Sequence, residues 1–180
     1  MGTGHNELKF RQAVLNASES QLWDEAKAEW KLHMVYNDHE NERSCKCEHS
    51  PIYQICLIRN RRNGNKLEVG NVCVRRFLRL MSHRIFAVLR RVHAERDKSL
   101  NPDSLDLFVE RGVLSPQERD DYKVYWRRRK HMTDQQRAQK KRINDRVLRF
   151  VQEETATLQA MARKYNLRVQ QRLPAFDLQP

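Results

Sequence analysis

Four cysteines lie within 29 residues of one another, and the rest of the 180-residue chain contains none. They are Cys45, Cys47, Cys56 and Cys73. Clustered thiolates are typical ligands of a tetrahedral zinc ion, and in a reducing compartment such clusters favour a metal over disulfides. Cys73 is expected at the start of a helix, where the helix N-terminus stabilises a thiolate. The sequence therefore predicts a zinc site; the alternative is four unrelated reduced thiols.

The fourth ligand of this site has two candidates. The dipeptide Asn63-Gly64 indicates a two-residue hairpin turn, and counting outward from it places Cys56 and Cys73 on one face of the hairpin as diagonal neighbours. This register favours Cys56. His49 is the alternative because it follows the first cysteine pair as C-x-C-x-H, and Cys56 would then be a small buried hydrophobe. Four protein ligands would make the metal structural, since no position remains for an activated water.

Hydrophobic periodicity predicts the elements that carry these cysteines. A helical pattern covers residues 6–28, and residues 30–36 alternate between apolar and polar as a strand does. A hairpin spans residues 51–70, and the pattern becomes helical from residue 72. Capping signals then predict helix starts at Asn101, Ser115 and Thr133.

These elements predict an α+β fold, mostly α, with a small zinc-bound β-hairpin module of treble-clef-like arrangement followed by a basic helical region. The expected parts are an N-terminal helical segment (1–29), a zinc-binding β-hairpin module (30–81), a basic helical region (82–165) and a flexible tail (166–180). The sequence shows no secretory signal and no apolar run of roughly 20 residues. We therefore expect a cytoplasmic protein without a membrane partner.

Positive charge is concentrated in parts of the chain. The net charge is +12 and the isoelectric point is near 9.9, which favours a polyanionic partner such as DNA or RNA. Residues 74–98 hold eight Lys or Arg against two acids, and residues 127–149 hold ten against two. Arginine dominates, which suits bidentate phosphate contacts. The predicted nucleic-acid-binding residues are Arg59, Arg61, Arg62, Lys66, Arg75, Arg76, Arg79, Arg127, Arg128, Arg129, Lys130, Lys140, Lys141 and Arg142.

The cysteine region resembles a small zinc-finger module found in uncharacterised bacterial and bacteriophage proteins. The pattern is C-x-C-G, then P-I, a strand ending in I-x-N, then N-G, and V-G-x-x-C-[VI] before a Phe. The matching residues are Cys45, Cys47, Pro51, Ile52, Ile58, Asn60, Asn63, Gly64, Val69, Gly70, Cys73, Val74 and Phe77. Glu48 replaces the family's glycine after the second cysteine. The resemblance implies zinc binding and a mobile-element origin, hence the cytoplasm of a bacterial host, but no reaction.

Enzyme motifs are missing from the sequence, which contains no Gly-rich phosphate loop, no H-E-x-x-H and no G-x-S-x-G. Asp38-His39 matches only a fragment of a histidine-containing nuclease motif. We therefore expect no catalytic activity, and predict a zinc-stabilised, nucleic-acid-binding accessory or regulatory protein of a phage or mobile element. The alternative is an inhibitor or adaptor that binds a host nucleic-acid-processing or defence complex, because a basic surface would serve either role.

Overall fold

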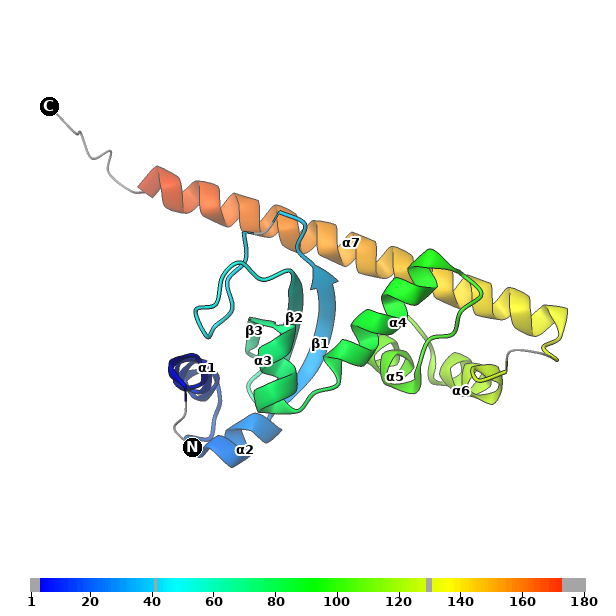
Figure 1. Cartoon of the computed structure of the whole chain (residues 1–180), viewed down its shortest axis with the longest axis horizontal. Coiled ribbons are helices and arrows are strands. Elements are labelled where there is room, and N and C mark those ends of the chain that lie inside the picture. The colour runs from blue at the N-terminus through cyan, green and yellow to red at the C-terminus, as the bar shows by residue number, and fades with distance from the viewer. Residues whose placement is uncertain (1–3, 41, 129–130, 173–180) are drawn as a thin grey trace, which may run out of the picture.

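A three-stranded antiparallel sheet with strand order β1-β2-β3 forms the base on which the helices pack (Figure 1). The structure is a computed structural model that describes residues 4–40, 42–128 and 131–172, with only the backbone described for residues 165–172. The strands are β1 (Trp30–Asn37), β2 (Gln54–Asn60) and β3 (Lys66–Gly70). Most of the remaining described residues are helical, so the predicted α+β fold, mostly α, is confirmed.

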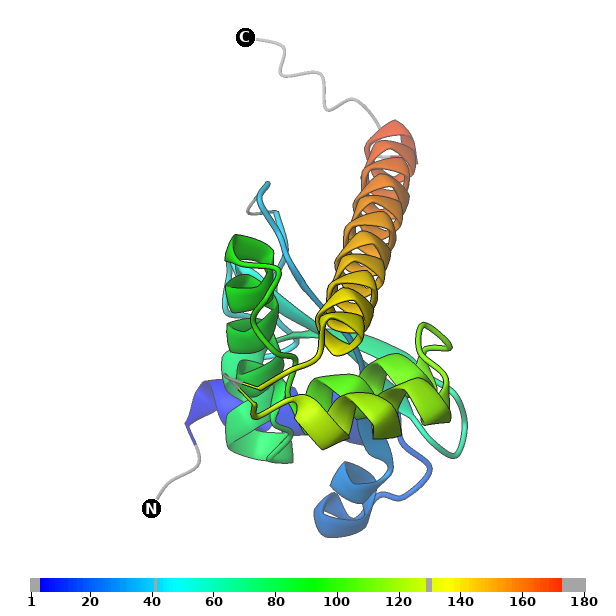
Figure 2. The same cartoon turned by 90° about the vertical axis from the view of Figure 1, so that its right-hand side faces the viewer.

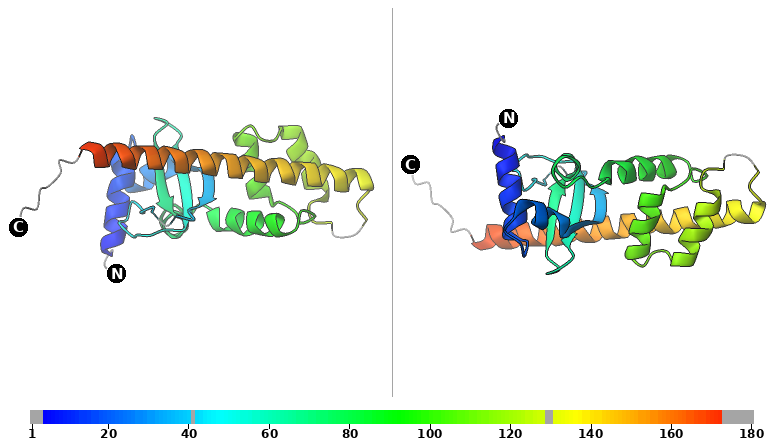
Figure 3. Two further views of the ribbon diagram at one scale, coloured as in Figure 1. Left: turned by 90° about the horizontal axis from the view of Figure 1, so that it is seen from above. Right: turned by 90° about the horizontal axis from the view of Figure 1, so that it is seen from below.

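Helices precede and follow the sheet and cover both of its faces. They are α1 (His5–Asn16), α2 (Trp23–Ala28), α3 (Asn71–Cys73), the π-helical turn η1 (Val74–Leu78), α4 (Ser82–Ala94), α5 (Pro102–Glu110), α6 (Pro116–Tyr125) and α7 (Asp134–Arg172). Figure 2 shows α3 and α4 on one side of the strands and α7 on the other. Figure 3 shows α7 crossing the sheet and continuing beyond it past α5 and α6.

One hydrophobic core connects the first helix to the last. Phe10 and Val14 of α1 belong to the same cluster of buried side chains as Ile55 of β2, Leu105 of α5 and Val147 of α7. Each fully buried side chain of this size stabilises the fold by about 1.5–3 kcal/mol relative to an exposed one. The N-terminal helices and the metal-site region therefore share a core.

The helix starts predicted from capping signals are confirmed. Asn101 and Ser115 each accept the backbone N–H three residues further on, at 2.9 and 3.1 Å, and Thr133 does the same at 3.2 Å. At its other end α7 continues to Arg172, so the expected boundary after residue 165 lies inside a helix. Residues 173–180 of the predicted tail lie outside the described part. Within that part, no helix combines the length and the apolarity that spanning a bilayer requires.

The hairpin between β2 and β3 has a longer loop than its Asn-Gly dipeptide predicts. The backbone N–H of Asn60 donates to Asn65 O at 2.8 Å, so the loop is the four residues 61–64. The buried Asn60 side chain accepts the N–H of Arg62 at 2.8 Å and of Asn63 at 3.3 Å. These side-chain bonds stabilise the wider turn, and of its residues only Gly64 has a positive φ, at 78°. The predicted two-residue turn was wrong.

An irregularity in β1 changes which side chains share a face of the sheet. The pairing with β2 shifts between Leu32 and Met34, which leaves His33 as an extra residue. Met34 therefore lies opposite Leu57, on the face that also carries Lys31 opposite Arg59. This face changes from apolar under α7 to cationic towards the hairpin loop.

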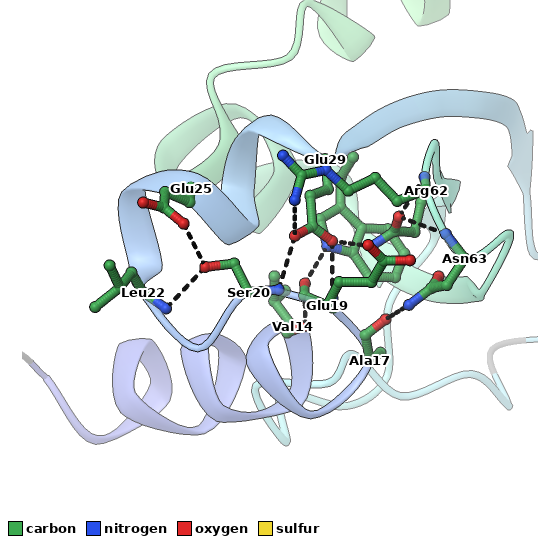
Figure 4. A network of polar contacts seen from close by, with 12 residues as sticks. Val14, Ala17, Glu19, Ser20, Leu22, Glu25, Glu29, Arg62 and Asn63 are labelled. Carbon is green, nitrogen blue, oxygen red and sulfur yellow. Dashed lines mark hydrogen bonds and ion pairs between the residues drawn. The ribbon is translucent and has the colours of Figure 1, made fainter.

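A buried carboxylate joins the N-terminal helices to the hairpin loop (Figure 4). Glu29 is 3% exposed and accepts the backbone N–H groups of Glu19 at 3.0 Å and Ser20 at 2.9 Å. It also accepts Asn60 Nδ2 at 2.6 Å and lies 3.7 Å from Arg62 Nη1. Burial by itself raises the pKa of Glu29, but the Asn60 and backbone hydrogen bonds together with the Arg62 charge outweigh it and lower the pKa. The carboxylate is therefore an ionised anchor for the hairpin.

Candidate metal centre

Three of the four cysteines converge on one point. The Sγ atoms of Cys45, Cys47 and Cys73 all lie within 4.8 Å of one another, and those of Cys47 and Cys73 are 3.5 Å apart. Sulfurs bound tetrahedrally to zinc at 2.3 Å are roughly 3.8 Å apart. The three side chains are buried, and all are free thiols. The donor set and its spacing fit a metal ion that prefers sulfur.

A tight turn in the loop before β2 brings the first two thiols together. The N–H of Cys45 donates to His49 O at 2.9 Å, and the N–H of Glu48 donates to Cys45 O at 2.8 Å. Glu48 adopts a φ of 69°, the left-handed conformation that a glycine would adopt more easily. Lys9 of α1 pairs with the Glu48 carboxylate at 3.0 Å. Glu48 therefore adopts the turn conformation for which the sequence pattern predicted a glycine.

The third thiol, that of Cys73, follows the end of β3 closely in the chain. Cys73 lies in α3, which begins directly after Gly70. The N–H of Gly70 donates to the sulfur of Cys45 at 3.2 Å. A Cβ at Gly70 would lie 3.5 Å from Ile52 and 3.7 Å from the Cys45 sulfur, so the strand end and the loop are in close contact. Thiols that could hold a metal ion therefore flank the hairpin in the chain, before β2 and after β3.

The three sulfurs share protons. The pKa of Cys45 is lowered to about 5, chiefly because the Cys73 thiol donates a hydrogen bond to it. Burial raises this pKa, but the backbone N–H groups of Cys47 and Gly70 also donate to the sulfur and lower it further. Burial raises the pKa of Cys47, and donation to Cys45 followed by burial raises the pKa of Cys73. The cluster therefore favours one thiolate and two thiols. A divalent cation would displace the remaining protons, as metal binding to cysteine generally does.

The predicted fourth ligand, Cys56, does not join this group. It pairs with Val69 across the hairpin, because the wider loop shifts the register by two residues from the predicted one. Its side chain is fully buried, and burial raises its pKa to about 12, against a hydrogen bond with Ser82. Cys56 is therefore a buried apolar side chain in the core, and its predicted role as the favoured ligand is corrected.

The alternative ligand, His49, lies at the same site but is not within ligand distance of all three sulfurs. Its side chain is exposed, and it lines a pocket of about 540 Å³ together with Cys45, Cys47 and Cys73. Pro51, Ile52, Tyr53, Val72 and Phe77 are among the apolar residues that line this pocket. The structure therefore presents three protein sulfurs and one pocket through which a further ligand can approach.

Asp38 shapes the loop that leads to the metal site. Its carboxylate accepts the backbone N–H groups of Glu40 at 3.2 Å, Glu42 at 3.0 Å and Arg43 at 3.2 Å. Its own N–H donates to Tyr53 O at 2.8 Å. These contacts give the Asp38 carboxylate a structural role, because both of its oxygens accept hydrogen bonds from backbone N–H groups of the loop.

The predicted nucleic-acid-binding residues are spread over several surfaces. The exposed members lie at the hairpin end, on η1 and directly after it, after α6, and on α7: Arg59, Arg61, Arg62, Lys66, Arg75, Arg76, Arg79, Arg127, Arg128, Lys141 and Arg142. Lys140 is only 6% exposed, and burial lowers its pKa. Arg129 and Lys130 lie outside the described residues. The described members of the set lie on different elements and do not form one patch.

Folding pairs some cations of the helical region with acids distant in sequence. Arg146 pairs with Glu118 at 2.6 Å, and Arg96 with Asp145 at 3.1 Å. Lys141, a predicted contact residue, lies 3.9 Å from Asp97. Within the described part of the chain, the side chains of three hairpin cations have no acidic partner; they are Arg59, Arg61 and Lys66.

Comparison of the chain with protein-family models, curated proteins and solved structures finds no match. The support for a metal centre is therefore the convergence of Cys45, Cys47 and Cys73. The resemblance of this region to bacterial and bacteriophage zinc modules stays a prediction.

Proposed function

We propose that the protein is a zinc-stabilised nucleic-acid-binding accessory protein of a phage or mobile element. The convergence of three buried thiols beside a hairpin carries this proposal, because three cations of that hairpin, Arg59, Arg61 and Lys66, have no acidic partner among the described residues. Zinc binds thiolate ligands and adopts tetrahedral geometry in structural sites, so it suits a buried group of sulfur atoms. Its role would be to lock the loop, the sheet and α3 together, so that the cations are held in place before a polyanion arrives.

His49 is the proposed fourth ligand. Its exposed imidazole lines the same pocket as the three sulfurs, so a rotation of the side chain is the smallest change that would complete a Cys₃His set. Such sets are typical of structural zinc. The backbone carbonyl of His49 already bonds to Cys45, which keeps the residue beside the cluster.

Replacing His49 with alanine is expected to weaken zinc binding by at least about tenfold without abolishing it, because three thiolates remain. Competition with a chromophoric chelator measures the affinity. His93→Ala, an exposed histidine on α4, is the matched control and should bind zinc as the wild type does. Equal zinc affinity in His49→Ala and the wild type would show that another group completes the site.

The zinc-loaded protein is expected to bind oligonucleotides in a salt-dependent manner. About four phosphate contacts would give a slope of about −3 to −4 in a plot of log K against log salt concentration on duplex DNA. Fluorescence anisotropy with random duplex and single-stranded oligonucleotides measures this between about 50 and 200 mM salt. No binding at the lowest salt would refute nucleic-acid binding and favour the alternative, an inhibitor or adaptor that binds a host protein complex.

A further inference from the structure

Three cations face one another across the sheet beside the hairpin loop. Lys31 of β1 lies directly opposite Arg59 of β2, and Arg59 lies directly opposite Lys66 of β3. Like charges in directly opposite positions destabilise a sheet, whereas opposite charges stabilise it. A row of three positive charges is therefore an arrangement that folding alone does not favour.

The protein does little to offset this row. Lys31 pairs with Glu110 at the end of α5, at 2.5 Å. Among the residues that the structure describes, the side chains of Arg59 and Lys66 have no ion-pair or hydrogen-bond partner, and the same holds for Arg61 in the loop. The guanidinium of Arg59 extends towards the hairpin loop, where its Nη2 would be 3.8 Å from a Cβ at Gly64. The row thus keeps a surplus of positive charge that is available to a ligand.

The same positive charges lower the pKa of a buried histidine, His33. The pKa of His33 is lowered to about 4, first by burial and then by the positive charges of Arg111, Lys66, Arg59 and Lys31. Arg111 Nη1 lies 2.8 Å from His33 Nε2, which fits a neutral imidazole that accepts a hydrogen bond. His33 therefore adds no charge of its own at neutral pH.

The cations border a hollow of suitable size. A pocket of about 390 Å³ is lined by Lys31, Arg59, Asn60, Arg61 and Glu110. Figure 3 shows that the hairpin loop and the helices α5 and α6 project to the same side of α7. The pocket is lined from both parts, because Arg59, Asn60 and Arg61 belong to the hairpin and Glu110 is the last residue of α5. A phosphate group with its attached sugar fits a space of this volume.

We propose that Lys31, Arg59, Arg61 and Lys66 form the surface that contacts the phosphodiester backbone of nucleic acid, with one phosphate seated in the pocket. This inference rests on the proposed nucleic-acid binding and assigns it to the hairpin end of the sheet. Glu110 on the pocket rim holds Lys31 in the free protein, and an arriving phosphate would compete with that carboxylate for the ammonium group.

The test compares two double variants of the zinc-loaded full-length protein that remove the same charge. Arg59→Ala/Lys66→Ala is expected to weaken oligonucleotide binding by at least about tenfold at 50 mM salt and to make the salt slope shallower by about 2. The matched control, Arg90→Ala/Arg149→Ala, removes two exposed arginines, of α4 and α7, that lie outside the predicted contact set, and it should change affinity less than about threefold. Equal weakening by the two variants would overturn the inference and leave the proposed function standing.

Two further readouts complete the test. Removing Arg59 and Lys66 relieves repulsion, so the melting temperature of this variant should equal or exceed that of the wild type, with one zinc per chain retained. Should alanine impair folding, Arg59→Gln/Lys66→Gln keeps the side-chain length and is held to the same binding criterion. Displacement of the oligonucleotide by a mononucleotide at an equal nucleotide concentration would indicate a nucleotide site and overturn the backbone contact. Absence of wild-type binding would instead refute the proposed function.

Discussion

Replacing Cys73 with serine is expected to lower zinc affinity by at least about 100-fold and to destabilise the protein by about 3 kcal/mol or more. The cause is that Cys73 is the proposed ligand joining α3 to the loop thiols Cys45 and Cys47, so its loss detaches the chain after β3 from a metal held by the loop. A decrease of this size corresponds to about 10 °C in melting temperature for a chain of this length. Elemental analysis of the reduced protein and thermal unfolding measure the two effects.

Cys56→Ala is the matched control for this experiment. It removes a buried thiol that lies outside the cluster, so it should retain one zinc per chain while the cavity costs about 1–2 kcal/mol of stability. Loss of the metal in both Cys56→Ala and Cys73→Ser would restore the ligand set predicted from the Asn-Gly turn, and retention of the metal in Cys73→Ser would remove the proposed ligand set.

Replacing Glu29 with glutamine is expected to destabilise the protein by about 2–4 kcal/mol. Two backbone N–H groups and the Asn60 amide would lose a charged acceptor. The NH₂ group of the new glutamine would also face these N–H donors, with which it cannot form a hydrogen bond. Urea unfolding at pH 7 measures the difference. Glu25→Gln is the control, because the exposed Glu25 carboxylate accepts only the Ser20 hydroxyl among the hydrogen bonds of the described residues, at 2.8 Å.

The pH dependence of this difference tests the ionised state of Glu29. Its pKa in the folded protein lies below the ordinary value of 4.5. The stabilisation is therefore fully present above pH 4.5 and is lost as the pH falls through the lower folded pKa. The difference in stability between the wild type and Glu29→Gln should therefore be smaller at pH 3.5 than at pH 7. An equal difference at the two pH values would show that the carboxylate is not ionised in the fold.

Short-range signals in the sequence determined most of the local structure. The caps at Asn101, Ser115 and Thr133 began helices as predicted, because a capping bond joins residues three apart and depends on little else. The proximity of Cys45, Cys47 and Cys73 was predictable for a similar reason, since side chains that flank one hairpin need only the hairpin to bring them together.

Two outcomes depended on tertiary contacts. The hairpin register, and with it the position of Cys56, followed from Asn60, whose side chain bonds both to its own loop and to Glu29. The preference of the Asn-Gly dipeptide for a two-residue turn contains no information about the Glu29 carboxylate, which lies 31 residues before Asn60.

The distribution of free charge was likewise decided only by the tertiary structure. Counting cations along the chain favoured the helical blocks, but folding brought Glu118 to Arg146 and Asp97 to Lys141 while three cations met across the sheet without a matching set of acids. Composition determines how much charge a protein carries. Because Coulomb interactions depend on distance in space, only the fold determines which charges remain available to a partner.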